Sequence, residues 1–434
     1  MLYEQAIKYL YNLQPIGIKL GLNNTLSLLA HFQNPHQKIK AIHVAGTNGK
    51  GSICSMLSSI LQSAGYKVGL YTSPHLIDFT ERISINGNPI PKSKVASLTE
   101  KIRCAIDDGD FKANHPTFFE VVTVMALIYF YEQSVDLAVM EVGMGGRLDA
   151  TNVIQPLMGI ISTISLDHQQ YLGNSLGCIA QEKAGIIKRG MPVIIGDCQP
   201  EVLQIITYTC QKMGSTLIQA PPLSNAHVLH QDLSGQKFEV LRPKKSPKQY
   251  SISLLGHHQI QNALITITAA EKLNDLLPRH ISHAQISKGL TSARWPGRIE
   301  VYPGSPLVII DGAHNPAAAH SLSRFIKELK FLHLTLVIGV MKDKKIDKIC
   351  QELVPLASRI ILTSPNIARA ALPREILQIL HSQSLLPNSV KVSLVDSIPE
   401  AITLAKTQSG LKDIICITGS LYTAGEAKVV LDER

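Results

Sequence analysis

The chain has 434 residues, of which 45% are hydrophobic and 17% are charged. This composition excludes bulk disorder, and the length predicts two or three domains with at least one large core. No uninterrupted apolar run approaches the roughly 18 residues of a membrane-spanning helix, so we expect no membrane partner.

Seven cysteines occur without any Cys-x-x-Cys pair, a pattern that indicates neither a zinc site nor a disulfide framework. The first residues (MLYEQAIKYLYNL) lack the charged-then-apolar pattern of a secretion signal. The sequence therefore predicts a cytoplasmic protein.

Lysine and arginine (42) outnumber aspartate and glutamate (33), which gives a formal charge of +9. The densest basic cluster, at 342–348, is interrupted by aspartates, and only 5% of the residues are aromatic, so we expect no nucleic-acid partner. A small polyanionic ligand and a merely solvated basic surface are both compatible with this charge.

The first predicted elements form a βαβ unit over residues 41–71. Its strands are predicted at Ala41–Ala45 and Val68–Tyr71, and apolar residues at helical spacing over 53–61 predict the helix between them. Gly65 stands where a glycine commonly ends a helix. Strand-like and helix-like segments alternate along most of the chain, which predicts α/β layers with mainly parallel sheets.

Further along, apolar strands are predicted at 137–142 and 159–164, whereas 221–251 is less regular and is predicted to be a surface excursion. A second α/β series begins near Leu307. Its predicted strands are Leu307–Ile310, Leu334–Ile338, 390–394 and 413–417, and its predicted helices are 322–329, Ile346–Leu353 and 398–406. The turn signal Pro296-Gly297 predicts the junction, with domains at 1–295 and 296–434.

A glycine-rich loop, residues 46–52 (GTNGKGS), lies between the first strand and its helix. Its glycines allow backbone N–H groups to converge on phosphate oxygens at a helix N-terminus. Lys50 can reach the terminal phosphates of a nucleotide, and the Ser52 hydroxyl can bind Mg²⁺. The loop departs from the pattern G-x-x-x-x-G-K-[ST], because its first spacing is shorter and Gly51 is inserted; a glycine-rich turn without a ligand is the alternative.

Three residues beyond the loop are candidates for the same chemistry. Glu141 ends a predicted strand, where a carboxylate beside a phosphate loop is well placed for Mg²⁺. His168 follows the predicted strand at 159–164, although a lone histidine is more often structural. Lys183 cannot bind a cation as an ammonium group; a phosphate contact and a helix salt bridge with Glu182 are its two alternatives.

The segment Gly46-Thr47-Asn48-Gly49-Lys50 resembles the ATP loop of the Mur ligase superfamily. Further segments, in family order, narrow the resemblance to the folylpolyglutamate synthase/dihydrofolate synthase family. They are SPHL at 73–76, ER at 81–82, TFFE at 117–120, EVGMGGRLDATN at 141–152, DH at 167–168, EKAGI at 182–186 and DGAHNP at 311–316. Each is weak alone, but the ordered set from about residue 17 to residue 420 is very specific.

The resemblance implies a two-domain α/β protein. Its N-terminal domain (1–295) would be a P-loop ATPase domain of the Mur ligase kind with a mainly parallel sheet, and its C-terminal domain (296–434) a Rossmann-like glutamate ligase domain. The implied activity is ATP-dependent amide ligation, in which L-glutamate is added to dihydropteroate, to (tetrahydro)folate or to both through an acyl phosphate. Mg²⁺ (two ions), ATP as co-substrate and a monomeric state are also implied.

The resemblance also assigns residues. The implied metal surroundings are Ser52, Ser73, Glu141, His168 and Lys183, the last as a carbamate formed with CO₂. The implied ATP contacts are Asn48, Gly49, Lys50, Gly51, Ser52, Asn262, Arg298 and Asp311. The implied pterin or folate contacts are Arg82, Thr117, Phe118, Phe119, Glu120, Leu148, Asp149 and Ala150, and the implied glutamate contacts are His314 and Ser420.

Lys50, Lys183, His314 and Asp311 are the implied catalytic residues, and either His314 or Asp311 would orient or deprotonate the attacking amine. An arginine such as Arg298, arriving from a second domain, would neutralise charge on the transferring phosphoryl group when the domains close. Ordinary roles stay open: a linker salt bridge for Arg298, and helix capping for Asn262, His314 and Ser420.

One position departs from the family. Some bifunctional members have Asp-Leu-Gly-Leu where this chain has Lys19-Leu20-Gly21-Leu22, so the charge is reversed at the position that the resemblance implies for a dihydropteroate-specific contact. The sequence therefore does not decide whether both folate activities are present. Two other hypotheses are a Mur-type ligase for a cell-wall precursor, which would carry an extra N-terminal domain for a uridine nucleotide, and an ATP-binding regulatory module without turnover.

Overall fold

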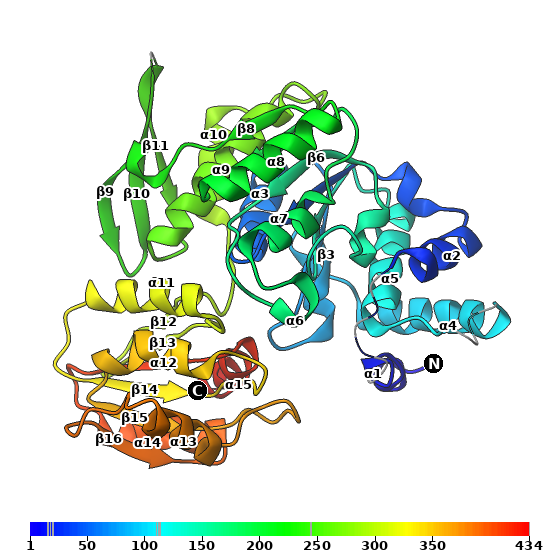
Figure 1. Cartoon of the computed structure of the whole chain (residues 1–434). Coiled ribbons are helices and arrows are strands. Elements are labelled where there is room, and N and C mark those ends of the chain that lie inside the picture. Colours follow the sequence, from blue (N-terminus) through cyan, green and yellow to red (C-terminus); the bar gives the residue numbers. More distant parts are fainter. Residues whose placement is uncertain are drawn as a thin grey trace. The chain divides into compact units, whose positions relative to one another are not determined.

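The computed structural model describes residues 1–14, 17, 19, 21–109, 111, 114–243 and 245–433. The chain divides into two units, each traced here by itself (Figure 1). Unit 1 comprises Met1–His230, Lys237–Ser253 and Ile260–Arg294, and unit 2 comprises Gln231–Gln236, Leu254–Gln259 and Trp295–Arg434.

The helices and strands of the first part of the chain alternate as predicted. The strands are β1 (Ala41–Ala45), β2 (Val68–Tyr71), β3 (Ile83–Ile85), β4 (Asn88–Pro89), β5 (Leu137–Glu141), β6 (Pro156–Ile161), β7 (Val193–Ile195) and β8 (Leu217–Gln219). The helices are α1 (Tyr3–Tyr11), α2 (Asn23–His31), α3 (Lys50–Ser63), α4 (Lys92–Asp108), α5 (Phe118–Glu132), α6 (Gln169–Leu172), α7 (Leu176–Ala184), α8 (Pro200–Lys212), α9 (His257–Leu273) and α10 (His283–Ser292). Short 3₁₀ turns are η2 (Pro35–Lys38), η3 (Phe79–Arg82), η4 (Ala150–Val153) and η5 (Leu223–Asn225).

The sheet of unit 1 has eight strands in the order β4-β3-β2-β5-β1-β6-β7-β8. The strands from β2 to β8 in this order pair in parallel, and β3 and β4 add an antiparallel edge. β1 lies between β5 and β6, with Ala41 opposite Ala138 on one side and Pro156 on the other. β1 and β5 are buried at every position, as expected for central strands of a parallel sheet covered on both faces. The carboxyl ends of β1, β5 and β6 therefore meet at one edge.

Helix α3 connects β1 to β2 and carries the predicted apolar face. Gly49, in the left-handed region with a φ of 87°, precedes it. Gly65, with a φ of 81°, follows its C-cap residue, Ala64, and so ends the helix as predicted. The α3 helix contacts β1, β2 and β5 and packs against α10.

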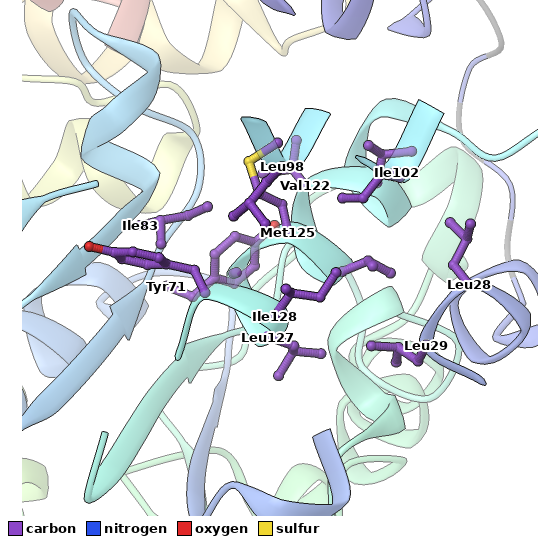
Figure 2. Close-up of a cluster of buried hydrophobic side chains, with 14 of the residues drawn as sticks. Leu28, Leu29, Tyr71, Ile83, Leu98, Ile102, Val122, Met125, Leu127 and Ile128 are labelled. Atoms are coloured by element: carbon purple, nitrogen blue, oxygen red, sulfur yellow. The ribbon is translucent and has the colours of Figure 1, made fainter. Parts of the chain in front are cut away.

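A second hydrophobic core surrounds α5. This helix is apolar on nearly every side, so it needs cover on all of them. Figure 2 shows its Val122, Met125 and Ile128 between side chains of β2 and β3 on one side and side chains of α2 and α4 on the other. The residues that flank it there are Tyr71, Ile83, Leu28, Leu29, Leu98 and Ile102.

Unit 2 holds a six-stranded sheet in the order β12-β13-β17-β14-β15-β16. Its strands are β12 (Glu300–Tyr302), β13 (Leu307–Ile310), β14 (Leu334–Ile338), β15 (Arg359–Leu362), β16 (Lys391–Leu394) and β17 (Ile414–Thr418). Its helices are α11 (Pro316–Lys327), α12 (Ile346–Leu353), α13 (Pro373–Ser382), α14 (Ile398–Gln408) and α15 (Leu421–Asp432), with the turn η6 (Val354–Leu356). β12 runs antiparallel to β13, and the strands from β13 to β16 in this order pair in parallel.

Alternate residues of the central strands of unit 2 enter different cores. Ile309 and Cys416 belong to one cluster, whereas Ile310 and Ile417 belong to the other. Because successive side chains of a strand point to opposite faces, helices cover this sheet on both sides. The two-domain α/β class predicted from the sequence, with a mainly parallel first sheet, is confirmed.

Two predicted elements are wrong. The strand predicted at 159–164 is β6, Pro156–Ile161, because Ser162 and Thr163 leave the strand and bind a loop carbonyl. The region 221–251 is no irregular excursion: it contributes β9 (Ala226–Asp232), β10 (Gly235–Arg242) and β11 (Lys245–Ile252), which form a three-stranded sheet. In β10 every second residue is buried, namely Gln236, Phe238 and Val240, but the lysines and prolines nearby obscure this alternation in the sequence. Lys244 of this region lies outside the described residues.

In the part of the chain that the structure describes, no helix is both long and apolar enough to cross a bilayer.

Candidate active site

The phosphate loop (residues 46–52) follows β1 at the carboxyl edge of the unit 1 sheet. Two of its glycines adopt a positive φ, 144° at Gly46 and 87° at Gly49. A Cβ at Gly46 would lie 1.8 Å from the Ser162 Oγ, and one at Gly49 would lie 2.3 Å from the Asn262 Oδ1. Both positions therefore require glycine, for conformation and for space.

Residues beyond β6 hold the loop in place. The Thr47 N–H donates to the Thr163 carbonyl over 2.7 Å. The Asn48 carbonyl accepts from the Ser162 Oγ at 2.6 Å and from the Thr163 Oγ1 at 3.2 Å. These bonds fix the loop from its carbonyl side, and the first N–H groups of α3, which no helix can pair internally, form its other side. Such an arrangement binds anions.

Two lysines converge on one loop carbonyl. The Lys50 Nζ donates to the carbonyls of Gly46 (3.1 Å) and Thr47 (3.2 Å), and the buried Lys183 Nζ donates to the same Gly46 carbonyl over 2.7 Å. Burial lowers the pKa of Lys183 to about 7, and the positive charge of Lys50 adds to this effect. The salt bridge with Glu182 that the sequence left open is not what the structure shows: Glu182 pairs with Arg147 at 2.8 Å.

Besides Lys183, four candidate metal residues lie on separate segments of unit 1. Glu141, the last residue of β5, is buried and accepts the Ser73 N–H at its Oε2 over 3.2 Å. Ser52 is buried in the first turn of α3. His168 precedes α6 with a positive φ of 49°, and its N–H donates to the Asp167 Oδ1 over 2.9 Å.

Within the described ranges, no three histidine, cysteine, aspartate or glutamate side chains converge tightly enough to hold a metal by themselves. Mg²⁺ in proteins keeps several waters and is commonly held by one or two carboxylates and the phosphates of a nucleotide. A buried carboxylate and a buried hydroxyl at the end of a phosphate loop have the oxygen chemistry that Mg²⁺ requires.

The candidate pterin segment at 117–120 begins α5. Thr117 and Glu120 form a capping box: the Glu120 Oε2 accepts the Thr117 N–H at 2.7 Å, and the Thr117 Oγ1 accepts the Glu120 N–H at 3.3 Å. Glu120 also accepts from the Asn24 Nδ2. These two side chains therefore have a structural role, whether or not they also contact a substrate.

The two phenylalanines between them have different neighbours. Phe118 lies under the Arg82 guanidinium, 5.1 Å from its ring centre, and Phe119 packs on Tyr71. The Arg82 Nε donates to the His75 Nδ1 over 2.7 Å, and burial together with Arg82 lowers the pKa of His75 to about 4. The neutral imidazole is thus an acceptor that fixes the guanidinium over the Phe118 ring.

The segment at 148–150 lies in the turn before η4. Asp149 is buried and caps that turn by accepting the Thr151 N–H at 3.0 Å, and burial raises the pKa of its carboxyl group. Ala150 is buried, and the Leu148 carbonyl accepts the Gly21 N–H over 3.4 Å.

Lys19, the departure from the family pattern, reaches the loop before α5. Its Nζ donates to the Asn114 Oδ1 at 2.9 Å and to the His115 carbonyl at 3.1 Å. Leu20 of the same motif lies outside the described residues. The Lys19 ammonium group is thus hydrogen-bonded to the loop that leads to Thr117.

In unit 2, Asp311 follows β13 and is buried. Its carboxylate accepts the N–H groups of Ile299 (2.9 Å) and Ala313 (2.8 Å). Burial raises the pKa of Asp311, and the nearby positive charge of Arg298 opposes this. A Cβ at Gly312 would lie 2.6 Å from the Arg298 Nη1, so Arg298 crosses this turn closely.

His314 and Ser420 stand at the ends of adjacent parallel strands of unit 2. The His314 Nδ1 lies 2.9 Å from the Gly312 carbonyl and donates to it, which leaves the Nε2 as an acceptor in the neutral ring. The cap of α11 is Asn315, so the capping alternative does not apply to His314. Ser420 does cap α15, since its Oγ accepts the Thr423 N–H at 3.0 Å. The capping role left open for Ser420 is therefore confirmed.

Several residues of this site were given no role from the sequence, although Thr47 and Thr151 stand in segments that it marked. Thr47, Ser162 and Thr163 shape the phosphate loop, and His43 and Thr151 connect β1 to the turn at Asp149. A usable signal existed for Ser162, because a polar pair directly after an apolar strand marks the functional edge of a parallel sheet. No such signal marked His43, which is one polar residue inside an apolar run.

Comparison with known proteins agrees with this geometry. The family model of the Mur ligase middle domain matches residues 44–270, and that of the Mur ligase glutamate ligase domain matches residues 297–421. The dihydrofolate synthase/folylpolyglutamate synthase of Bacillus subtilis is 37% identical over 97% of both chains. The folylpolyglutamate synthase of Lacticaseibacillus casei is 32% identical over 99% of both chains.

Solved structures agree as well. The folylpolyglutamate synthase of Mycobacterium tuberculosis, solved with ADP and AMPPCP, superimposes with a TM-score of 0.88 at 30% identity and covers 99% of both chains. The FolC protein of E. coli, solved with DHPP and ADP, has a TM-score of 0.85 at 31% identity over 99% of this chain and 98% of that one. The chain therefore belongs to the folylpolyglutamate synthase/dihydrofolate synthase family of ATP-dependent ligases, within the Mur ligase superfamily.

Proposed function

We propose that this protein joins L-glutamate to the carboxyl group of dihydropteroate, of (tetrahydro)folate or of both, and uses one ATP for each amide bond. The observation that carries the proposal is the convergence of Lys50 and the buried Lys183 on the Gly46 carbonyl, in a glycine-dependent loop at a helix N-terminus. Relatives solved with ADP or an ATP analogue support the choice of nucleotide, and the E. coli relative solved with DHPP supports the class of acid.

The chemistry explains why a nucleotide is needed. A carboxylate is a poor electrophile, because its charge repels nucleophiles and it has no good leaving group. Transfer of the γ-phosphoryl group of ATP to the carboxylate gives an acyl phosphate and ADP. The neutral amine of glutamate then attacks the acyl carbon, the C–O bond to phosphate breaks, and inorganic phosphate leaves while the nitrogen loses a proton.

Lys50 and the start of α3 would stabilise the phosphates. In the structure the Lys50 ammonium bonds the loop carbonyls, so it lies at the loop into which phosphates would enter. Asn48, Gly49, Gly51 and Ser52 would surround the phosphates, and Asn262 would contact the nucleotide beside Gly49. We assign Arg298 and Asp311 of unit 2 to the same nucleotide from the family resemblance.

Mg²⁺ would be held by Ser52, Ser73, Glu141 and His168, with two ions in all. When bound, Mg²⁺ supplies positive charge that offsets the negative charge of the transferring phosphoryl group. The Ser73 N–H on the Glu141 Oε2 orients this carboxylate.

Lys183 would act as a carbamate. Its lowered pKa, about 7, leaves much of the amine neutral at physiological pH, and only the neutral amine attacks CO₂. The nitrogen bonds to the carbon of CO₂ and releases one proton, which converts a cation into an anion with two oxygen ligands. The remaining N–H can keep the bond to the Gly46 carbonyl. Asp167 and Asp149 lie close enough to Lys183 to act on its charge.

The substrates would bind at different segments. Arg82, Thr117, Phe118, Phe119, Glu120, Leu148, Asp149 and Ala150 of unit 1 are assigned to the pterin or folate. His314 and Ser420 are assigned to glutamate. Either His314, whose Nδ1 donates to the Gly312 carbonyl, or Asp311, whose carboxylate accepts two N–H groups, would orient or deprotonate the amine. We also propose a monomer, a cytoplasmic location and no nucleic-acid partner; seven free cysteines suit a reducing compartment.

Release of phosphate from ATP tests the function. We expect release only when Mg²⁺, L-glutamate and a pterin-benzoate acid are all present, with dihydropteroate and tetrahydrofolate offered in separate reactions to separate the two activities. D-glutamate is the matched control. Release with uridine-linked cell-wall precursors would instead support a Mur-type ligase, and no glutamate-dependent release with any acid would refute the proposal.

A further inference from the structure

His43 is a polar residue in the middle of β1, at the centre of the unit 1 sheet. It is fully buried, with Met140 of β5 opposite it on one side and Gly159 of β6 on the other. Every other residue of the strand is apolar, and an apolar residue there would avoid the desolvation of an imidazole. Burial lowers the pKa of His43 to about 3, and the nearby Lys188 adds to this, so the ring is neutral at physiological pH.

The hydrogen bonds from His43 through Thr151 to Asp149 allow one assignment of donors and acceptors. Its Nε2 lies 2.8 Å from the Thr151 Oγ1, and the same Oγ1 donates to the Asp149 Oδ1 at 2.5 Å. A hydroxyl group has one proton, and here it points to the carboxylate. The His43 Nε2 must therefore carry the ring proton and donate it to Thr151.

Asp149 is held by this chain of donors and by the backbone. Its Oδ1 also accepts the Thr151 N–H at 3.0 Å, and its Oδ2 accepts the Met144 N–H at 2.9 Å. The other ring nitrogen of His43, Nδ1, has no hydrogen-bond partner among the described residues. A buried acceptor without a partner is unfavourable for folding, so stability alone does not explain a histidine at this position.

We propose that His43 is a positioning residue for the substrate: through Thr151 it fixes the Asp149 carboxylate in the turn that binds the pterin ring. The inference rests on the proposed function, which assigns the 148–150 turn to the pterin or folate. His43 stands three residues before Gly46 on the strand that leads into the phosphate loop. The β1 strand thus carries both the residue that positions the pterin turn and, at its end, the loop that would hold the nucleotide.

Two substitutions of His43 place a side-chain amide near one or the other of the two ring-nitrogen positions. In His43→Gln the side-chain amide reaches about as far as the Nε2 and can still donate to Thr151, whereas in His43→Asn the amide ends near the Nδ1. We expect the KM for dihydropteroate, or for tetrahydrofolate, to rise about 10-fold in His43→Asn and less than 3-fold in His43→Gln. The KM for ATP should stay within 2-fold in both.

The partner residue gives an independent test. Thr151→Val removes the hydroxyl at almost constant volume and should raise the same KM, whereas Thr151→Ser should restore it. The double variant His43→Asn/Thr151→Val should be no worse than Thr151→Val alone, because both remove one chain of hydrogen bonds. Thermal unfolding of each variant shows whether it folds. If His43 had a purely structural role, its substitution would lower the unfolding temperature and would shift the KM values for ATP and for the acid together.

The inference is overturned if His43→Asn and His43→Gln behave alike, or if the KM values for ATP and for the acid rise in parallel. Failure of the proposed function is a different outcome, since it is seen in the unsubstituted protein as an absence of glutamate-dependent phosphate release. In that case direct binding of dihydropteroate, measured by calorimetry, would replace KM, and equal affinity of the unsubstituted protein and His43→Asn would refute the role of His43.

Discussion

At the scale of single residues, the phosphate loop depends on positions where a side chain has no room. Gly49 combines a φ of 87° with a Cβ position 2.3 Å from the Asn262 Oδ1. Gly190 has a similar φ of 74° but nothing within 4 Å of its Cβ position. Substitutions at Gly49 and Gly190 therefore distinguish the effect of backbone strain from the effect of the contact with Asn262.

We therefore expect Gly49→Ala to weaken binding of a non-hydrolysable ATP analogue at least 10-fold, because the new methyl group displaces Asn262 and the loop. Gly190→Ala should only destabilise the fold, by about 1 kcal/mol, through left-handed strain. Calorimetry measures the affinity, and urea unfolding measures the stability. Equal affinity of both variants for the analogue would show that the contact with Asn262 does not matter.

Lys183 gives a prediction that depends on pH and on CO₂. Because its pKa is lowered to about 7, the neutral amine, and with it the carbamate, increases as the pH rises from 6 to 8. Removal of CO₂ should lower turnover and bicarbonate should restore it, and ¹³C-bicarbonate should give a carbamate signal by NMR that Lys183→Ala lacks. We expect Lys183→Ala to lose at least 100-fold in turnover. Near-normal turnover of this variant at ordinary Mg²⁺ would contradict the carbamate.

At the scale of elements, the sequence predicted the strands that are mainly apolar and buried. β1, β2, β13 and β14 are of this kind, and the structure has them at the predicted residues. The strand at 159–164 was misplaced because Ser162 serves the loop rather than the sheet. Such residues are set by contacts distant in sequence, which a local pattern does not contain.

The start of α5 shows the same limit for the candidate site. The sequence marks 117–120 by its resemblance to a substrate segment, but Thr117 and Glu120 also cap their own helix. A resemblance identifies the residue type that is needed and does not reveal that the residue has two roles. The turn at Asp149 is a second case, because its carboxylate is both a cap and a candidate contact.

The cap predicts a loss of stability. Thr117→Ala should lower the free energy of unfolding by about 1 kcal/mol, because the Glu120 N–H loses its acceptor. Thr117→Ser keeps the oxygen and should restore most of it. Chemical denaturation measures both, and the KM for the pterin acid, measured in parallel, reports any additional contact with substrate. An unchanged stability in Thr117→Ala would show that the cap contributes nothing.

The environment of Asp413, which precedes β17 in unit 2, predicts that the stability of the fold depends on pH in the acidic range. Burial alone would raise its pKa, but the Gly410 N–H, Arg359 and His333 outweigh this and hold the pKa of Asp413 below its usual value. A carboxyl group with a lowered folded-state pKa stabilises the fold fully above its unfolded pKa, about 3.9, and this stabilisation is lost as the pH falls through the folded pKa.

Asp413→Asn should therefore destabilise the protein by about 2 kcal/mol at pH 7, and the difference from the unsubstituted protein should shrink below about pH 4. Urea unfolding, followed by circular dichroism at several pH values, measures this. Asp275→Asn, an exposed partner of Lys272, is the control and should change stability by less than about 0.5 kcal/mol. A difference that is constant down to pH 2 would exclude the role of the Asp413 charge.

At the scale of the whole molecule, the chain passes between the two units five times, after residues 230, 236, 253, 259 and 294. Two short segments, Gln231–Gln236 and Leu254–Gln259, belong to unit 2 although they lie far before its main part in the sequence. Leu255 is buried in the unit 2 core with Ile299, and both Gln231 and His257 bond the Glu328 carboxylate.

No single position in the chain therefore separates the two units. A stop codon after Arg294 would leave Leu255 without its core, because the two short pieces of unit 2 would remain without the main piece, Trp295–Arg434. Exchange of the glutamate ligase half between relatives would require three transplanted stretches rather than one, so chimaeras joined only at the Pro296-Gly297 turn are expected to express poorly even when both parents are stable.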